Sequence, residues 1–328
     1  MKRYTTGWIL ALAIAALLCQ GCAALRSASP EPFTIVVLPD TQNYADATAM
    51  QKGGADDLRD TFYRQTEWIK ANQKELNIVM VAHAGDVTQT DHPKEWAVAD
   101  TAFKTLDGAV PYILCLGNHD IGRGTAPEVS DNSRRTNLNT VFPPARLQHQ
   151  PNSGYAGSWD GKCQNYALTF QGADMDFLIV SLEYKPRDEA LAWANEVIAA
   201  HPRHRCILLT HGYLDAEGRL YDASHYKHEG NGGVGMWEKL VQRHENLFLV
   251  LCGHVLGESR RTDPGEHGNP VHQLLADYQG MPHGGDGYLR IMTFVPLEDT
   301  IHVRSYSPVL DKSLTEDASQ FSLDYPMK

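Results

Sequence analysis

Short runs of consecutive apolar residues recur along the chain, and each is too short for a buried helix. They are rich in β-branched residues and leucine: FTIVVLP (33–39), NIVMVA (77–82), VPYILCL (110–116), DFLIVSL (176–182), CILLT (206–210) and LFLVLC (247–252). A strand that is buried on both faces has this continuous pattern. The runs therefore predict a set of buried strands.

Helical spacing of apolar residues lies between several of these strands. In segment 57–76, Leu58, Phe62 and Ile69 fall on one helical face, and helices are also predicted over 94–106, 188–200 and 234–244. Alternating strands and helices indicate an α/β fold with a largely parallel sheet.

The last third of the chain has a different pattern. Segments 287–296 and 300–307 alternate apolar and polar residues and are separated by only three residues, which predicts an antiparallel hairpin at the rim of a second sheet. No repeat or interdomain linker interrupts 33–312, which we interpret as one domain. Residues 313–328 are polar and are expected to form a C-terminal tail on the surface.

Polar side chains directly follow five of the predicted strands. Their positions are Asp40, Asp86, the triplet 118–120, His211 and His254. In α/β sheets the loops beyond the carboxyl ends of the strands converge on one crevice. We therefore expect these side chains, distant in sequence, to meet in space.

The chemistry of these residues favours a metal cluster. Aspartate, asparagine and histidine suit Mn²⁺, Fe or Zn²⁺. A carboxylate can bridge two such ions about 3.5–4 Å apart, and the pair activates water and holds phosphoryl oxygens. A histidine beside the cluster can give a proton to a leaving oxygen. Hydrolysis of a phosphate ester needs this set of groups.

The strings GDV (85–87), GNHD (117–120) and GHV (253–255), with His211 between the last two, resemble the calcineurin-like metallophosphoesterases. The order and spacing match across roughly residues 33–260. The resemblance implies a four-layer α/β/β/α sandwich, in which two mixed sheets are flanked by helices, and a site for two divalent metal ions.

The resemblance also implies a role for each matching ligand. Asp86 would bridge the two metal ions. Asn118, His211 and His254 would complete the second metal site, and Asp40 would belong to the first.

On the substrate side, the resemblance implies that Asn118 and His119 contact the phosphate ester. His119, paired with Asp120, would stabilise or protonate the leaving group while metal-activated hydroxide attacks phosphorus. His119 and Asp120 are therefore the expected catalytic residues.

Two departures from the family pattern weaken the first metal site. Gln42 stands where the opening Asp-x-His has its histidine, and Leu256 stands where Gly-His-x-His has its second histidine. Gln42 still offers an amide oxygen as a ligand, or else it is a loop amide that bonds the backbone. The first site would be oxygen-rich and suited to Mn²⁺ or Mg²⁺, or filled only with substrate present. Either Glu258 or Asp277 is a candidate replacement ligand.

Other polar and aromatic residues have weaker claims to the site. His83 is expected to face the core or the back of the sheet. His225 and His228 lie in a polar, glycine-rich loop that either contacts substrate or is simply solvated, and Tyr44 and Tyr278 either stack on a substrate or pack in the core.

Composition narrows the range of partners. The chain of 328 residues has 42% hydrophobic residues and 29 Lys+Arg against 40 Asp+Glu. This acidic balance argues against a nucleic-acid groove. A phosphorylated small molecule or lipid remains compatible, because bound metal ions supply local positive charge.

The beginning of the chain resembles a bacterial lipoprotein signal. Two basic residues precede the apolar segment 7–18, and a glycine stands directly before Cys22. We expect residues 1–21 to be a signal peptide, Cys22 to be lipidated and 22–32 to be a tether. Cleavage by ordinary signal peptidase near 23–29 is the alternative. Either route implies export, and the first adds a membrane anchor at the cell envelope.

The remaining cysteines are Cys115, Cys163, Cys206 and Cys252. An exported protein can form disulfides. However, three of them lie in strand-like apolar runs, which favours buried thiols that act as small hydrophobes.

Three functions are compatible with the sequence. The leading hypothesis is an exported, lipid-anchored, metal-dependent phosphoesterase that acts on a monoester or a diester. The second is a metal-dependent binding protein that holds a phosphorylated ligand with little or no turnover, and the third is a structural envelope lipoprotein.

Overall fold

The computed structural model describes residues 30–122, 132–222, 224 and 228–327. The predicted signal peptide, Cys22 and His225 lie outside these residues. No helix of the described part is long and apolar enough to cross a membrane. The α-helices are α2 (Ala47–Lys52), α3 (Arg59–Asn72), α4 (Pro93–Lys104), α5 (Leu138–Val141), α6 (Pro144–Leu147), α7 (Asp188–Ala200), α8 (Gly233–Lys239) and α9 (Pro282–Gly285).

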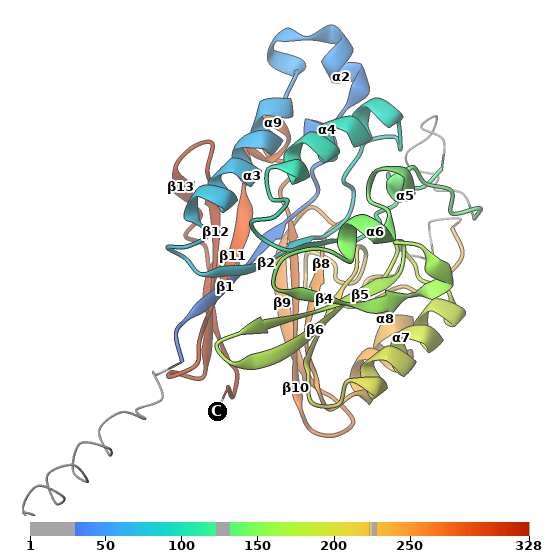
Figure 1. The fold of residues 1–328 in the computed structure, drawn as a ribbon, viewed down its shortest axis with the longest axis vertical. Coiled ribbons are helices and arrows are strands. Elements are labelled where there is room, and N and C mark those ends of the chain that lie inside the picture. The colour runs from blue at the N-terminus through green and yellow to red at the C-terminus, as the bar shows by residue number, and fades with distance from the viewer. Residues whose placement is uncertain (1–29, 123–131, 223, 225–227, 328) are drawn as a thin grey trace, which may run out of the picture.

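Two mixed sheets form the centre of the protein (Figure 1). The first has the order β13 (Lys312–Ser313), β12 (Thr300–Ser307), β11 (Leu289–Val295), β1 (Phe33–Leu38), β2 (Ile78–His83) and β3 (Tyr112–Leu114), and β14 (Gln320–Asp324) also pairs with β12. The second has the order β4 (Ser153–Ser158), β5 (Tyr166–Gly172), β6 (Met175–Ser181), β7 (Arg205–Leu209), β8 (Leu247–Cys252), β10 (Pro270–Asp277) and β9 (Gly257–Pro264).

The central strands of each sheet are parallel, so their carboxyl ends lie at the same edge of the sheet. In the first sheet β1, β2 and β3 are parallel. In the second sheet β6, β7, β8 and β10 are parallel. The side-chain period of two then divides each strand between two faces. In β7, Ile207 and Leu209 join the core between the sheets, whereas Cys206 and Leu208 join the core under the helices.

Aromatic rings fill the space between the two sheets. The ring of Phe33 in β1 lies 5.5 Å from that of Phe177 in β6 and 4.7 Å from that of Phe294 in β11. Phe248 in β8 completes the group, 6.3 Å from Phe177. Because large aromatic side chains contribute most to core packing, this contact holds the sheets face to face.

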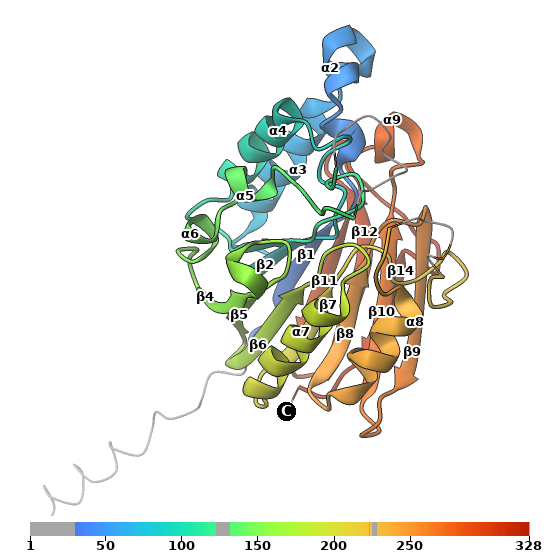
Figure 2. The same ribbon diagram turned by 90° about the vertical axis from the view of Figure 1, so that its right-hand side faces the viewer.

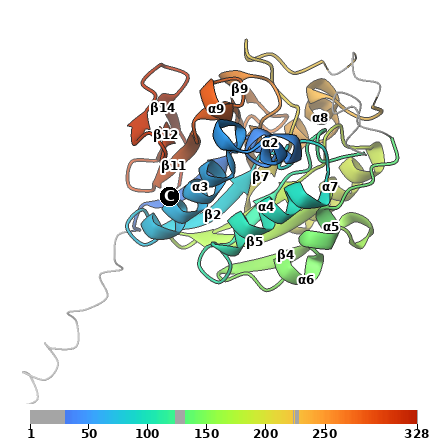
Figure 3. The same cartoon turned by 90° about the horizontal axis from the view of Figure 1, so that it is seen from above.

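Helices cover both outer faces. Helices α3 and α4 run side by side over the first sheet (Figures 1 and 3), where Phe62 and Phe103 pack against the buried ring of His83. Helices α7 and α8 lie over the second sheet (Figure 2), where Leu191 and Met236 share a core with its strands. This arrangement confirms the four-layer α/β/β/α sandwich.

Some sequence expectations require correction. The hairpin of β11 and β12 forms as expected, but it extends the first sheet next to β1 rather than edging the second. The C-terminal segment is not only a surface tail, because β14 adds to the first sheet through β12. The helix expected over 234–244 ends as α8 and continues as a 3₁₀ turn at Val241–Arg243.

Candidate metal centre

Polar side chains from both sheets meet at the carboxyl ends of the parallel strands. Asp86 follows β2, His211 follows β7 and His254 follows β8. Their potential ligand atoms all lie within 4.8 Å of one another. Asn118, beyond β3, joins them, because its Oδ1 lies 3.2 Å from Nε2 of His211. These four residues are called the ligand cluster below.

Glycines let the ligand cluster close up. A Cβ atom on Gly117 would overlap the carboxylate of Asp86, and one on Gly253 would overlap the carboxylate of Asp40. The chain therefore needs glycine before Asn118 and before His254. This close approach is a physical reason for the Gly-Asn and Gly-His pairs in the sequence.

The imidazole of His211 is oriented as a metal ligand. Its Nδ1 lies 2.8 Å from the carbonyl oxygen of Ala84, a contact in which the ring N–H donates. In the neutral ring that bond leaves the lone pair on Nε2, which lies 3.1 Å from Oδ2 of Asp86. A backbone carbonyl that fixes the tautomer of a histidine is a common support for metal binding.

Two tyrosines support the histidines. Nε2 of His254 lies 2.9 Å from the hydroxyl of Tyr221, and the ring of Tyr184 lies 5.0 Å from His254 and 5.8 Å from His211. The sequence did not point to either tyrosine. No motif marks either one, although Tyr184 lies three residues beyond the end of β6.

Asp40 and Asp277 lie together beside the ligand cluster, and Oδ2 of Asp40 is 4.0 Å from Nε2 of His211. Asp40 accepts a hydrogen bond from the backbone N–H of His254 at 3.1 Å. The side-chain amide of Gln279 donates to both carboxylates, at 3.3 Å to Asp40 and 2.9 Å to Asp277. Both acids are 1% exposed. Of the two replacement ligands considered from the sequence, Asp277 is thus beside the first metal site.

Glu258 is not available as the replacement ligand. Its carboxylate is 2.7 Å from the Arg290 guanidinium and accepts hydrogen bonds from the hydroxyls of Tyr278 and Ser305. These partners occupy it away from Asp40. The alternative that Glu258 replaces the missing histidine is therefore wrong.

The pKa values divide the three buried carboxylates into two groups. Burial, with the charges of Asp277 and Asp86, raises the pKa of Asp40 well above its ordinary value. Burial raises the pKa of Asp277 to about 6. Burial also acts to raise the pKa of Asp86, but the charges of His211 and His119 outweigh it and lower that pKa. A bound cation would stabilise the ionised forms of Asp40 and Asp277.

Gln42 lies beside His119 and has a buried side-chain oxygen that no described residue hydrogen-bonds. Its side chain is 5% exposed, and its Oε1 is buried without a hydrogen-bond partner among the described residues. Its Nε2 lies 3.5 Å from Nε2 of His119. A buried amide oxygen without a partner is costly, and a cation is one group that satisfies it.

The expected pairing of His119 with Asp120 is wrong. Nδ1 of His119 lies 2.8 Å from the carbonyl oxygen of Gln89. The carboxylate of Asp120 instead accepts hydrogen bonds from the backbone N–H groups of Val87, Thr88 and Gly117 and from the Thr88 hydroxyl. Neighbouring loop residues point in different directions, so Asp120 fixes the two ligand-bearing loops and Gln89 orients His119.

The weaker candidates lie outside the ligand cluster. His83 is fully buried, and its Nε2 lies 2.9 Å from the Thr41 hydroxyl. Tyr44 and Tyr278 are packed and hydrogen-bonded in the interior. His228 is 2% exposed, with its ring 5.7 Å from that of Tyr184, so it is not a solvated loop residue.

All four cysteines of the described chain are buried thiols. Cys115, Cys163, Cys206 and Cys252 form no disulfide. This confirms the interpretation of these residues as small hydrophobes.

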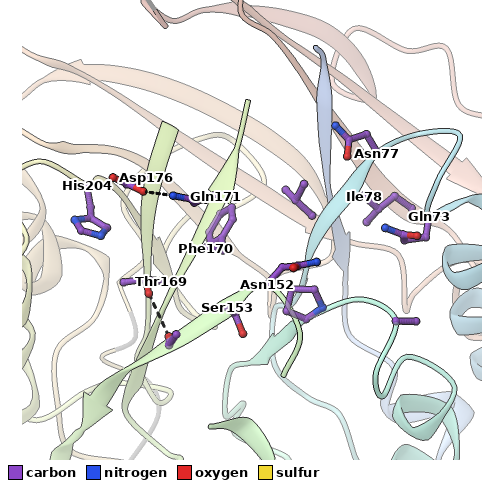
Figure 4. Close-up of a pocket in the computed structure, with 14 residues that line it drawn as sticks. Gln73, Asn77, Ile78, Asn152, Ser153, Thr169, Phe170, Gln171, Asp176 and His204 are labelled. Atoms are coloured by element: carbon purple, nitrogen blue, oxygen red, sulfur yellow. Dashed lines mark hydrogen bonds between the residues drawn. The ribbon is translucent and has the colours of Figure 1, made fainter. Parts of the chain in front are cut away.

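A separate cavity lies at the opposite end of the strands (Figure 4). It has a volume of about 530 Å³ and is lined at the amino ends of β2, β6 and β7 by Ile78, Asp176 and His204. Asp176 accepts a hydrogen bond at 2.9 Å from the Gln171 amide, which also lines the cavity. The ligand cluster is at the carboxyl ends, so this cavity is not its substrate cleft.

The residues of the second metal site fit a divalent cation. Asp86, Asn118, His211 and His254 offer two imidazoles, a carboxylate and an amide oxygen, a mixed nitrogen and oxygen set that suits Mn²⁺, Fe or Zn²⁺. Ligands with fixed partners, such as His211 on Ala84, are preorganised for binding.

Comparison with known proteins gives matches in sequence and in fold. The family model for the calcineurin-like phosphoesterases matches residues 33–258. A Bacillus subtilis protein named uncharacterized protein YvnB is 33% identical over 310 residues. That match covers 90% of this chain but only 22% of the relative, so the chain spans a minor part of that protein.

Two solved phosphatases have a similar fold. Purple acid phosphatase PPD1 from yellow lupin (Lupinus luteus) seeds superposes with a TM-score of 0.54 at 14% identity, over 90% of this chain and 54% of the lupin chain. A dimetal phosphatase from Danio rerio superposes with a TM-score of 0.53 at 13% identity, over 90% of this chain and 100% of the other. At such low identity these matches establish the shared fold.

Proposed function

This chain belongs to the calcineurin-like phosphoesterase family, and from that premise we propose that it hydrolyses a phosphate ester of a small molecule or lipid with divalent metal ions. The observation that carries the proposal is the ligand cluster. Asp86 and Asn118 come from one sheet, His211 and His254 come from the other, and His211 presents Nε2 to the other ligands.

The proposed role of the ligand cluster is to bind the metal ions and keep them in position. Asp86, Asn118, His211 and His254 would hold one ion, and Asp40 with Asp86 would hold a second. Divalent ions in such a pair supply Lewis acidity and lower the pKa of water. The carbonyl of Ala84 keeps His211 in the ligating tautomer.

His119 is the proton donor of the proposed reaction. It is only half-buried, whereas the ligands Asp86 and His211 are buried. The carbonyl of Gln89 accepts from Nδ1, which leaves Nε2, 3.5 Å from the Gln42 amide nitrogen, as the nitrogen that would carry a proton to a leaving oxygen. Its backbone N–H donates to Asp86 at 2.9 Å, so the donor is fixed to the ligand cluster.

A substrate panel tests the proposal. The purified chain is stripped of metal, reloaded with Mn²⁺, Zn²⁺, Fe²⁺ or Mg²⁺, and assayed on an aryl phosphomonoester, a bis-aryl phosphodiester, nucleotides and phospholipid headgroups. We expect metal-dependent release of product from at least one class. A chain that retains stoichiometric metal and binds phosphate esters without any turnover is instead the binding protein. A chain that retains no metal is neither a metal-dependent enzyme nor a metal-dependent binding protein, and it fits the structural lipoprotein instead.

The proposal includes a cellular location, and the residues that support it lie outside the described part of the chain. The apolar segment 7–18 and Cys22 support export and a lipid anchor at the cell envelope. Labelling with radioactive palmitate in a bacterial host tests the anchor. We expect label and membrane association in the wild type and loss of both in Cys22→Ser. Release of an unlabelled chain by both forms would contradict the anchor.

A further inference from the structure

The first metal site of this chain lacks both histidines of its family pattern, yet its carboxylates remain buried. Gln42 replaces one histidine and Leu256 the other. The Leu256 side chain is 56% exposed and can offer no ligand atom. A Cβ on Gly280 would lie 3.0 Å from Cδ1 of Leu256, so the leucine lies over the loop that follows Asp277.

We infer that Asp277 takes the place of the missing histidine, so that Asp40, Asp86, Asp277 and Gln42 form a first metal site made only of oxygen ligands. The inference rests on the proposed metal-dependent function and names the ion class of that site. Such a site selects hard cations, Mn²⁺ or Mg²⁺, over Zn²⁺.

The first observation in support of this site is the position of Asp277. It ends β10, which is parallel to β8, so it reaches the same edge of the second sheet as His254. The Gln279 side chain donates to Asp277 at 2.9 Å and to Asp40 at 3.3 Å through one nitrogen. Both carboxylates therefore point at the Gln279 nitrogen, and a cation bound between them would replace that nitrogen as their shared partner.

A second, independent observation comes from Gln42. It is 5% exposed, and its Oε1 has no hydrogen-bond partner among the described residues. The residue lies two positions after Asp40, where the family pattern has a ligand. A cation between these oxygens gives Gln42 the partner that the protein does not supply.

The remaining acid near Leu256 does not compete. Glu258 is two residues from Leu256 in sequence, but Arg290 holds its carboxylate at 2.7 Å. Asp277 is thus the acid that the fold brings to Asp40.

Metal binding by the full chain tests the inference without any assay of activity. Metal-free protein is titrated with Mn²⁺ by calorimetry, and bound Mn²⁺ is followed by electron paramagnetic resonance. We expect two ions per wild-type chain. In Asp277→Asn one ion should remain and the other should bind about 10–100-fold more weakly. The matched control Asp263→Asn, on the edge strand β9, should keep both ions.

Two results would overturn the inference: a wild type that binds a single Mn²⁺, or an Asp277→Asn variant that binds two as tightly as the wild type. If Asp277→Asn does not fold, the variant Leu256→His at an exposed position provides a second test. We expect it to raise Zn²⁺ affinity at the first site at least about tenfold, and an unchanged Zn²⁺ affinity counts against the inference. A chain that passes these tests but hydrolyses no ester contradicts the proposed function alone.

Discussion

Nε2 of His211 lies 3.1 Å from Oδ2 of Asp86, although the first residue follows a strand of the second sheet and the second follows a strand of the first. This contact joins the first sheet of the sandwich to the second. Asn118 and His254 repeat the division, one from each sheet. Each sheet therefore supplies only part of the ligand cluster.

Asp86→Asn should abolish most turnover and leave the fold intact. The amide keeps an oxygen for the His119 backbone N–H, which donates to Asp86 at 2.9 Å, but removes the charge that holds two cations together. We expect kcat to fall by at least about 100-fold, equal to about 2.7 kcal/mol. Steady-state kinetics with saturating Mn²⁺ and circular dichroism check this, and unchanged hydrolysis by a folded variant would remove the mechanism.

His119→Ala should lose activity in a manner that depends on the leaving group. A proton donor matters when the departing oxygen is a poor leaving group and little when it is a good one. With an alkyl ester we expect a loss of about 10²–10⁴-fold, and with a nitrophenyl ester a smaller loss. His149→Ala, an exposed histidine, is the control. Equal losses on both substrates would assign His119 to another role.

Gly117→Ala should expel metal and destabilise the protein. The added methyl group would overlap the carboxylate and backbone of Asp86, so one of the two loops must move. Gly268→Ala is the comparison, because its surroundings are open and only its positive φ of 78° costs energy, about 1–2 kcal/mol. We expect Gly117→Ala to lose bound metal in elemental analysis while Gly268→Ala retains it. Equal metal contents in both variants would be inconsistent with the close approach.

The buried Asp91 should make stability depend on pH. Burial raises its pKa to about 6, despite hydrogen bonds from the Trp96 indole at 2.7 Å and the Asn137 N–H at 2.8 Å. Between the ordinary aspartate pKa of about 3.9 and about 6, the folded protein binds more protons at this site than the unfolded chain, so its contribution to stability falls as pH rises. Above that window the contribution is constant.

Asp91→Asn removes this titration. Melting temperatures of both proteins between pH 4 and pH 7 provide the measurement, with other carboxylates common to both. We expect the variant to gain on the wild type as pH rises to about 6 and the offset to stay level above it. Parallel curves over the whole range would show that Asp91 titrates normally.

The sequence predicts most interior strands of this fold better than its edges, although the buried strand β10 is not predicted. The strands β1, β2 and β6 to β8 are buried on both faces and give continuous apolar runs. Strand β9, with the sequence GESRRTDP, is largely exposed, and β4 is half-buried throughout. An edge strand with few buried residues has no apolar run to reveal it, and these strands were therefore missed.

The site shows a similar division. Strand-end positions predict which side chains meet, because parallel strands deliver their ends to one edge. They do not predict the direction of a side chain within a loop, so the sequence pairs His119 with its neighbour Asp120, whereas in the structure its partner is the Gln89 carbonyl. Nor do they separate Glu258 from Asp277, since the partner Arg290 is 32 residues away in the chain.

The aromatic packing between the sheets has a consequence for how this protein tolerates change. Phe33 and Phe177, whose rings lie 5.5 Å apart, stand near the amino ends of β1 and β6, so they fix the spacing of the two sheets at the end opposite the ligand cluster. A smaller side chain at either position would leave a cavity between the sheets and lower the stability of the fold. Damage to the core and damage to the cation site can therefore be separated in this protein, because they arise at opposite ends of the same strands.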